Sequence, residues 1–258
     1  MTLIQSELHW QQVEANLAMF EEKIWKVEDK TDLIILPEMF TTGFSMEPQG
    51  LAEPVNGRTY KWMKQMAAQT GATVIGSAII KEGQQYYNRL IVASPEGSVG
   101  HYDKKHLFTL AGEDGQFTPG NQRLIIEVNS WRILPLVCYD LRFPVWSRSR
   151  SSDERTYEYD LVLYCANWPS PRVNAWDALL KARAIENSAY CLGVNRIGID
   201  GYGKEYPGHS AVYNFQGDTS TFLEGDSSAT AILSKDDQEK YRERFPFQKD
   251  AMPFTLDS

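Results

Sequence analysis

Hydrophobic residues are arranged in short runs that end at polar or reactive side chains. Residues 32–36 (DLIIL) and 160–164 (DLVLY) are almost entirely apolar, which is typical of strands covered on both faces. Residues 131–137 form a third apolar run, and Cys138 follows it directly. Further strands are expected at residues 2–5, 72–80, 86–93, 99–102, 123–128, 190–195, 210–213 and 229–233.

Four segments are predicted to be helices, most clearly where apolar positions recur every three or four residues. The first is marked by Val13, Leu17, Phe20, Ile24 and Val27. The second covers residues 58–70 and ends before Gly71, in the position that glycine favours after a helix. Its predicted core-facing residues are Trp62, Met63, Met66 and Ala67. The third covers residues 175–187, with an apolar side made of Trp176, Leu179, Leu180 and Ile185, and the fourth covers residues 235–244.

The order of these elements predicts the fold class. Strands and helices alternate early and late in the chain, with hairpins between them, which favours an α/β protein built as a layered α-β-β-α sandwich over a simple parallel sheet. Neither a Gly/Ser-rich nor a Pro-rich tract divides the sequence, so we expect one domain over residues 1–258, with 235–258 as a C-terminal helix and tail. Residues 103–121 lack periodicity, and so long a loop in a compact domain is usually either functional or disordered.

Composition narrows the class of partner and the compartment. The net charge of −8 argues against nucleic acid or an anionic membrane as a partner. An apolar run long enough to span a bilayer is lacking, and so is a secretory leader at the N-terminus. The chain has three well-separated cysteines, which do not resemble a disulfide framework. We therefore expect a cytoplasmic protein.

Three reactive side chains follow predicted strands. Glu38 comes after residues 32–36, Lys104 after residues 99–102, and Cys138 after residues 131–137. Side chains at strand ends gather along one edge of a sheet, where α/β proteins place their sites. A turn that follows such a cysteine leaves backbone N–H groups that lower the thiol pKa and can hold an oxyanion. Taken singly, each residue has a structural alternative, because free cysteines fill cores and lone charged residues lie on surfaces.

Histidine chemistry is an open alternative at this point. A cysteine–histidine hydrolase needs an imidazole near Cys138, and the sequence leaves His106 and His209 as candidates. No pair of cysteines or histidines has the spacing of a metal site, and no glycine-rich phosphate loop follows a strand. Neither a zinc site nor a nucleotide-binding site is therefore expected.

Five blocks of the sequence together resemble the nitrilase, or carbon–nitrogen hydrolase, superfamily. They are residues 36–40 (LPEMF), 102–108 (YDKKHLF), 137–144 (VCYDLRFP), 166–169 (ANWP) and 182–187 (ARAIEN). The blocks occur in the family's order and cover nearly the whole chain. The finer resemblance is to the omega-amidases, which hydrolyse the side-chain amides of 2-oxoglutaramate and 2-oxosuccinamate; Trp146, Trp168 and Trp176 contribute to it. Asp103 stands where many members have arginine, and Lys104 keeps its place.

The resemblance implies a role for each matching residue. Cys138 would be the nucleophile, Glu38 its general base and Lys104 the cation that stabilises the oxyanion. Glu113 would be the additional glutamate that helps to position substrate and water. The resemblance also implies the α-β-β-α sandwich, catalysis without a cofactor, and a homodimer or larger homo-oligomer.

The chemistry of an amide substrate adds further candidates. The Tyr139 backbone N–H, next to the nucleophile, is a second expected oxyanion donor. A substrate carboxylate needs a cation in this acidic protein, and we expect Arg142 first and Arg172 second, because the arginine fork suits a carboxylate. Phe44, Trp146 and Trp168 are candidate walls of the pocket.

Two other functions remain open from the sequence. One is another hydrolase of the same superfamily, acting on an N-carbamoyl compound, a simple amide or a nitrile. The other is a catalytically silent relative that binds a ligand. The presence of Glu38, Lys104 and Cys138 together favours an enzyme over the silent relative.

Overall fold

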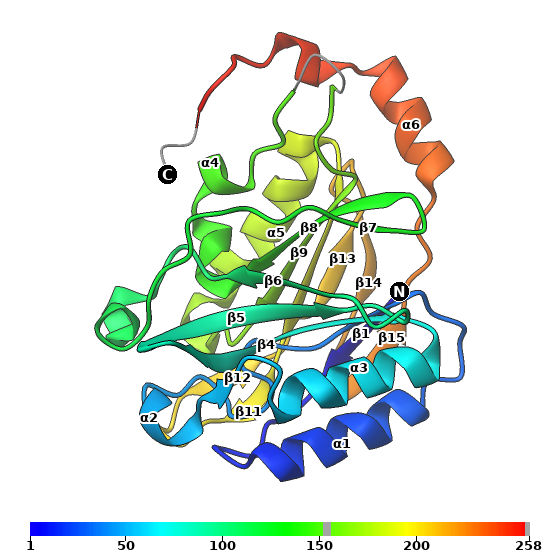
Figure 1. Ribbon diagram of the computed structural model, residues 1–258. Coiled ribbons are helices and arrows are strands. Elements are labelled where there is room, and N and C mark those ends of the chain that lie inside the picture. The colour runs from blue at the N-terminus through cyan, green and yellow to red at the C-terminus, as the bar shows by residue number, and fades with distance from the viewer. Residues whose placement is uncertain (152–155, 256–258) are drawn as a thin grey trace.

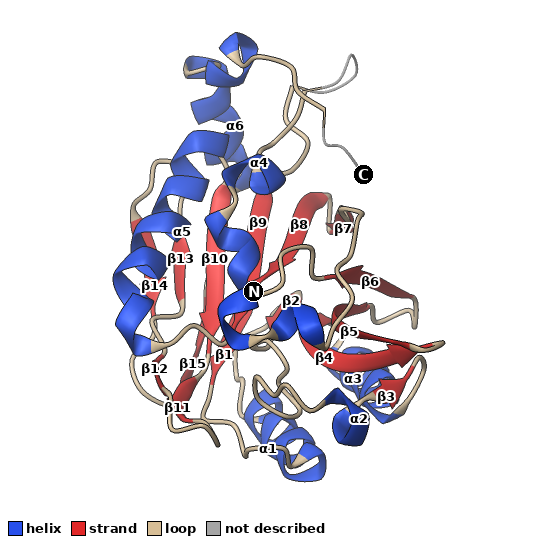
Figure 2. Cartoon of the chain, turned by 90° about the vertical axis from the view of Figure 1, so that its left-hand side faces the viewer, coloured by secondary structure: helices blue, strands red, loops and turns tan. Residues whose placement is uncertain are grey.

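Two mixed β-sheets are stacked face to face, with helices on both outer faces (Figure 1). The computed structural model describes residues 1–151 and 156–255. Helices α1 (Val13–Trp25) and α3 (Arg58–Thr70) cover one sheet, and α5 (Val173–Asn187) covers the other (Figures 1 and 2). This arrangement confirms the predicted α-β-β-α sandwich.

The first sheet has the strand order β15-β1-β2-β4-β5-β6, and β3 pairs with β4. Its strands are β1 (Thr2–Gln5), β2 (Leu33–Ile35), β3 (Glu53–Pro54), β4 (Thr73–Glu82), β5 (Gln85–Ala93), β6 (Val99–Asp103) and β15 (Ser227–Thr230). Strands β1, β2 and β4 are parallel, whereas β4, β5 and β6 form an antiparallel meander.

The second sheet has the order β14-β13-β10-β9-β8-β7. Its strands are β7 (Ile126–Val128), β8 (Trp131–Val137), β9 (Leu161–Ala166), β10 (Tyr190–Asn195), β13 (Ala211–Tyr213) and β14 (Thr219–Phe222). The central strands β8, β9 and β10 are parallel. A separate hairpin pairs β11 (Ile197–Ile199) with β12 (Glu205–Pro207). The remaining helices are α2 (Pro48–Leu51), α4 (Pro144–Ser147) and α6 (Lys235–Arg244).

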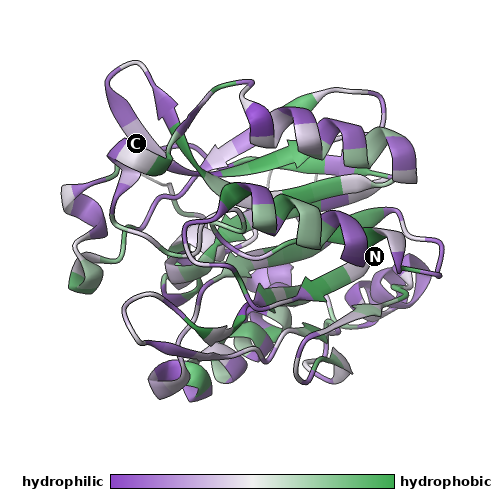
Figure 3. Cartoon of the chain, turned by 90° about the horizontal axis from the view of Figure 1, so that it is seen from below, coloured by the Kyte–Doolittle hydropathy of each residue, from purple (hydrophilic) through white to green (hydrophobic). Residues whose placement is uncertain are grey.

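The main core lies between the two sheets. Ile35 and Leu90 from the first sheet belong to the same buried cluster as Leu134 and Leu163 from the second. A second cluster joins the outer face of the first sheet to α1 and α3, and the hydrophobic colouring of the strands in Figure 3 follows this layering. None of the helices in the described residues is long and apolar enough to cross a membrane.

Several elements match the sequence-based ranges residue by residue. The strands at 2–5, 131–137 and 190–195 and the helices at 58–70 and 235–244 are confirmed. The predicted inner face of α3 is also confirmed, since Trp62, Met63, Met66 and Ala67 are all buried, and Gly71 ends the helix with a φ of +69°.

Other boundaries and one side-chain orientation were predicted wrongly. The strand expected at 123–128 covers only Ile126–Val128, and the strand expected at 229–233 is β15, whose pairing with β1 ends at Thr230. The first helix ends at Trp25, before Val27. Ile185 is 47% exposed because it lies off the buried side of α5, which is formed by Trp176, Leu180, Arg183, Ala184 and Asn187. The segment 147–158 is polar and strongly charged, which is typical of a solvated loop, and its residues 152–155 lie outside the described residues.

Candidate active site

Cys138 lies where β8 turns sharply into a 3₁₀ turn, Cys138–Arg142. Its φ is +43°, in the left-handed region that is unfavourable for a residue with a Cβ atom. Asp140 holds the turn in place: its Oδ2 accepts hydrogen bonds from the Val137 N–H at 3.1 Å and from the Tyr102 hydroxyl at 2.7 Å. Backbone strain that persists because surrounding contacts enforce it points to a functional position.

Glu38, Lys104 and Glu113 form a buried ionic cluster. Lys104 Nζ donates to Glu38 Oε1 at 2.8 Å and to Glu113 Oε1 and Oε2 at 3.0 and 2.9 Å. All three side chains are completely inaccessible to solvent. Glu38 follows β2, Lys104 follows β6, and Glu113 comes from a 3₁₀ turn (Glu113–Gly115) in the long loop after β6. The first sheet therefore supplies Glu38 and Lys104, and the second sheet supplies Cys138.

The electrostatics of the cluster keep the lysine charged and the thiol protonated. Burial alone would lower the pKa of Lys104, but the charges of Glu113 and Glu38 outweigh burial and raise it above its usual value. Burial raises the pKa of Cys138 well above its usual value; Glu38 adds to the rise and Lys104 opposes it. Burial also raises the pKa of Glu113, with Lys104 opposing and Glu38 reinforcing the shift.

These pKa directions define what proton transfer can do here. A thiolate is unfavourable while Glu38 is ionised, because two negative charges would be buried side by side. If the Cys138 proton moves to Glu38, the net charge of the cluster does not change. The arrangement therefore favours a thiolate that forms as its proton passes to the carboxylate.

Two asparagines that the sequence analysis gave no role also contact the cluster. The Asn167 backbone N–H donates to Glu38 Oε2 at 2.9 Å, and Asn88 Nδ2 donates to Glu38 Oε1 at 2.7 Å. Asn88 shares a face of β5 with Leu90 and Val92, which pack between the sheets. A polar residue within that apolar alternation was the signal that could have identified Asn88.

A small cavity opens above Cys138. Besides Cys138 it is lined by Phe44, Lys104, Phe108, Tyr139, Arg142, Asn167, Trp168, Pro169, Arg172, Lys204 and Tyr206. The Arg142 guanidinium lies 5.0 Å from the Trp168 ring centre, and that of Arg172 lies 5.0 Å from the Phe108 ring centre. Neither arginine forms an ion pair with another described residue. Within that part of the chain, a structural salt bridge therefore does not account for the position of Arg142. None of the residues lining this cavity is acidic.

The structure separates one wall candidate from the cavity and adds two residues. Trp146 is buried behind the site, where its Nε1 donates to the Tyr102 hydroxyl at 3.0 Å, so its prediction as a wall was wrong. Lys204 and Tyr206 come from the β11–β12 hairpin, whose three-residue strands left no clear pattern in the sequence.

The two candidate histidines, His106 and His209, each pair with an aspartate away from the cavity. His106 Nδ1 lies 2.8 Å from Asp140 Oδ1, and His209 Nδ1 lies 3.0 Å from Asp177 Oδ2. Neither residue lines the cavity, so the geometry does not support a cysteine–histidine pair. No group of three potential metal ligands occurs in the part of the chain that the structure describes.

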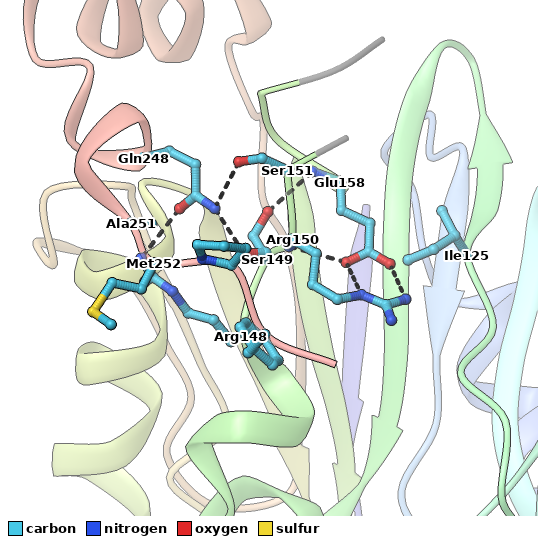
Figure 4. A pocket seen from close by; sticks show the side chains of 11 residues that line it. Ile125, Arg148, Ser149, Arg150, Ser151, Glu158, Gln248, Ala251 and Met252 are labelled. Carbon is cyan, nitrogen blue, oxygen red and sulfur yellow. Dashed lines mark hydrogen bonds and ion pairs between the residues drawn. The ribbon is translucent and has the colours of Figure 1, made fainter. Parts of the chain in front are cut away.

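A larger cavity of about 580 Å³ lies elsewhere, between the loop after α4 and the C-terminal segment (Figure 4). Its charged groups already have partners: Arg150 pairs with Glu158 at 2.9 Å, and Arg148 donates to Gln248 Oε1 at 3.1 Å. Among the described residues that line it, none is a nucleophile or an unpaired acid comparable with Cys138 and its neighbouring cluster. The smaller cavity is therefore the better candidate for an active site.

A family model described as carbon-nitrogen hydrolase matches residues 2–242. The chain belongs to the carbon-nitrogen hydrolase family. The matched region contains Glu38, Lys104, Glu113 and Cys138, so the buried cluster lies entirely within the hydrolase domain model.

Individual members of the family are similar over most or nearly all of this hydrolase. Omega-amidase YafV of Escherichia coli K12 is 44% identical, over 99% of this chain and 97% of that protein. The 2-oxoglutaramate amidase of Bacillus subtilis 168 is 30% identical, over 81% and 80% of the two chains. The crystal structure of XC1258 from Xanthomonas campestris, a CN-hydrolase superfamily protein with an arsenic adduct in its active site, is 40% identical, with a TM-score of 0.97 over 99% and 98% of the two chains.

Proposed function

We propose that this carbon-nitrogen hydrolase hydrolyses the side-chain amide of 2-oxo-dicarboxylic acid monoamides, such as 2-oxoglutaramate and 2-oxosuccinamate, to the 2-oxo acid and ammonia. The observation that carries the proposal is the buried Glu38–Lys104–Glu113 cluster beside Cys138, with Lys104 and Cys138 lining a cavity that also presents Arg142 and Arg172. The similarity to an omega-amidase and to a 2-oxoglutaramate amidase supports the substrate class.

In the first half-reaction Cys138 attacks the carboxamide carbon while its proton passes to Glu38. The carbonyl oxygen becomes an oxyanion, which accepts hydrogen bonds from the Lys104 ammonium and the Tyr139 backbone N–H. Tyr139 is suited to this role because the first N–H groups of a helical turn have no partner within it. Glu38 then gives its proton to the leaving nitrogen, the C–N bond breaks, and ammonia departs from a Cys138 thioester.

In the second half-reaction water replaces ammonia. Glu38 takes a proton from the water, whose oxygen attacks the thioester carbonyl carbon. The oxyanion again contacts Lys104, the C–S bond breaks, and the proton on Glu38 returns to the sulfur. Glu113 accepts two hydrogen bonds from Lys104 and so holds the ammonium beside the reacting carbonyl group.

The cations around the cavity suit the other end of the substrate. Arg142 is the proposed anchor for the substrate carboxylate and Arg172 the second candidate, with Lys204 adding positive charge. Phe44 and Trp168 are proposed to form the walls along the short carbon chain. We further propose that the enzyme works as a homodimer or larger homo-oligomer, and in the cytoplasm, where a reducing environment keeps the Cys138 thiol free.

A comparison of 2-oxoglutaramate with glutamine tests the substrate class. The two amides differ in their 2-oxo and 2-ammonium groups. An ammonium near Arg142, Arg172 and Lys204 is repelled and finds no acidic partner in the cavity lining. Ammonia-release assays are expected to give kcat/KM at least about 100-fold higher for 2-oxoglutaramate. Equal values for both, or faster release from an N-carbamoyl amino acid, a simple amide or a nitrile, would contradict the proposal.

A further inference from the structure

Asn88 contacts three members of the catalytic cluster. Its Nδ2 donates to Glu38 Oε1 at 2.7 Å and to Glu113 Oε1 at 3.1 Å. Its main-chain carbonyl accepts a hydrogen bond from the Lys104 N–H at 3.0 Å. The residue is 1% exposed, so these contacts form away from water, where a hydrogen bond to a charged group is strong.

Ser77 fixes the orientation of the Asn88 amide. The Ser77 hydroxyl oxygen accepts a hydrogen bond from the Met39 N–H at 2.8 Å and lies 2.9 Å from Asn88 Oδ1. A hydroxyl has one proton, and here that proton is directed to Oδ1. The amide nitrogen, with both of its N–H groups, therefore faces the two carboxylates.

The two oxygens of Glu38 are consequently unequal. Oε1 accepts hydrogen bonds from Lys104 and Asn88, which fill the two positions that a carboxylate oxygen offers in its plane. Oε2 accepts the Asn167 N–H and keeps one position open. We propose that Asn88 is a positioning residue that holds Glu38 and Glu113 beside each other and reserves Glu38 Oε2 for the proton that Cys138 releases.

The inference rests on the proposed cysteine mechanism, and it holds for any amide that the enzyme hydrolyses. It predicts the behaviour of Asn88→Ala, which lacks the amide donor, and of Asn88→Asp, which places a third carboxylate in the cluster. Each change disfavours the ionised form of Glu38. The acidic limb of the pH–rate profile, which reports ionisation of the base, is expected to move to higher pH in both variants. In Asn88→Ala, kcat should fall by about 10- to 100-fold while KM changes by less than about threefold.

The control is Asn187→Ala, which removes another buried asparagine amide, one that bonds the Ser149 N–H and the Arg183 carbonyl. It should lower stability and leave the acidic limb in place. Turnover is measured with whichever amide of the substrate panel the unaltered enzyme hydrolyses. The pH dependence of Cys138 alkylation by iodoacetamide provides a readout without substrate.

The outcomes separate the two proposals. An acidic limb unchanged in both Asn88 variants, with kcat within about threefold of the unaltered enzyme, would overturn the role of Asn88 while leaving amide hydrolysis intact. A shifted alkylation profile in an enzyme that releases no ammonia from any amide would contradict the proposed function and support the positioning role. Where Asn88→Asp fails to fold, Asn88→Ala decides alone.

Discussion

The proposed anchor for the substrate carboxylate is one arginine side chain, Arg142 first and Arg172 second. Arg142 and Arg172 line the cavity, are stacked on aromatic rings, and form no ion pair within the described residues. An arginine of this kind keeps all of its donors for a ligand, and its ring contact reduces the entropy lost when the ligand binds. Arg183 provides the contrast, since it donates to Glu186 at 2.9 Å and to the Leu141 carbonyl at 2.7 Å and so has a structural role.

Arg142→Ala is therefore expected to weaken binding of the substrate carboxylate specifically. KM for 2-oxoglutaramate should rise by more than about tenfold, because a charge-assisted pair is lost, whereas KM for a neutral amide of similar length should change by less than about threefold. Steady-state ammonia release with both amides measures the difference. Equal changes for the two amides would remove Arg142 as the anchor, and the same pair of assays on Arg172→Ala would then test the second candidate.

Elements with strong local patterns were predictable, and those defined by pairing with distant strands were not. Strand β8 was predicted to the residue because its apolar run is bounded by the turn at Asn129–Ser130, where both residues have positive φ, and by Cys138. The β11–β12 hairpin was missed, although it brings Lys204 and Tyr206 to the cavity. Its strands are too short to show periodicity. The contact of Asn88 with Glu38 depends on the strand order of the first sheet, and that of Asn167 depends on how the two sheets stack. Neither arrangement has a local sequence pattern that predicts it.

One buried carboxylate contributes to the attachment of helix α6 to the second sheet, beside hydrogen bonds from Gln238 and Arg242 to main-chain carbonyl groups. Asp160, directly before β9, accepts hydrogen bonds from Arg132 at 2.9 Å and from Arg242 of α6 at 2.9 Å. Burial alone would raise the pKa of Asp160, but its hydrogen bonds with Arg132, together with the charges of Arg132 and Arg242, outweigh burial and hold the pKa below its usual value.

We expect Asp160→Asn to lower the free energy of unfolding by about 3 kcal/mol at neutral pH, because it leaves the buried Arg242 and the partly buried Arg132 without their counter-charge. A carboxylate with a lowered folded-state pKa stabilises the fold above its unfolded pKa, and this contribution is lost as the pH falls through the folded value. The difference between the unaltered protein and the variant should therefore shrink below about pH 4. Urea unfolding at a series of pH values measures it, and a difference that grows with acidity would contradict the assignment.

In the whole molecule, the residues of the candidate active site come together only where the two sheets meet. The first sheet provides Glu38 and Lys104, and the second provides Cys138 at the end of β8. The core between the sheets holds these strands together. The packing of the sandwich therefore sets the distance between the Glu38 carboxylate and the Cys138 sulfur. The strained backbone of Cys138 is maintained by Asp140, which also accepts a hydrogen bond from Tyr102 of the first sheet.

Ammonia release from 2-oxoglutaramate by Cys138→Ala is the most decisive test of hydrolysis through a Cys138 thioester. Alanine keeps the backbone of the turn and removes the sulfur, so the protein should fold, with a melting temperature within a few degrees of the unaltered enzyme as a check. Cys191→Ala, which removes a buried cysteine of β10, is the matched control and should retain activity. Ammonia release by Cys138→Ala is expected to fall by at least about 10⁴-fold. Release within about tenfold of the unaltered enzyme would contradict hydrolysis through a Cys138 thioester.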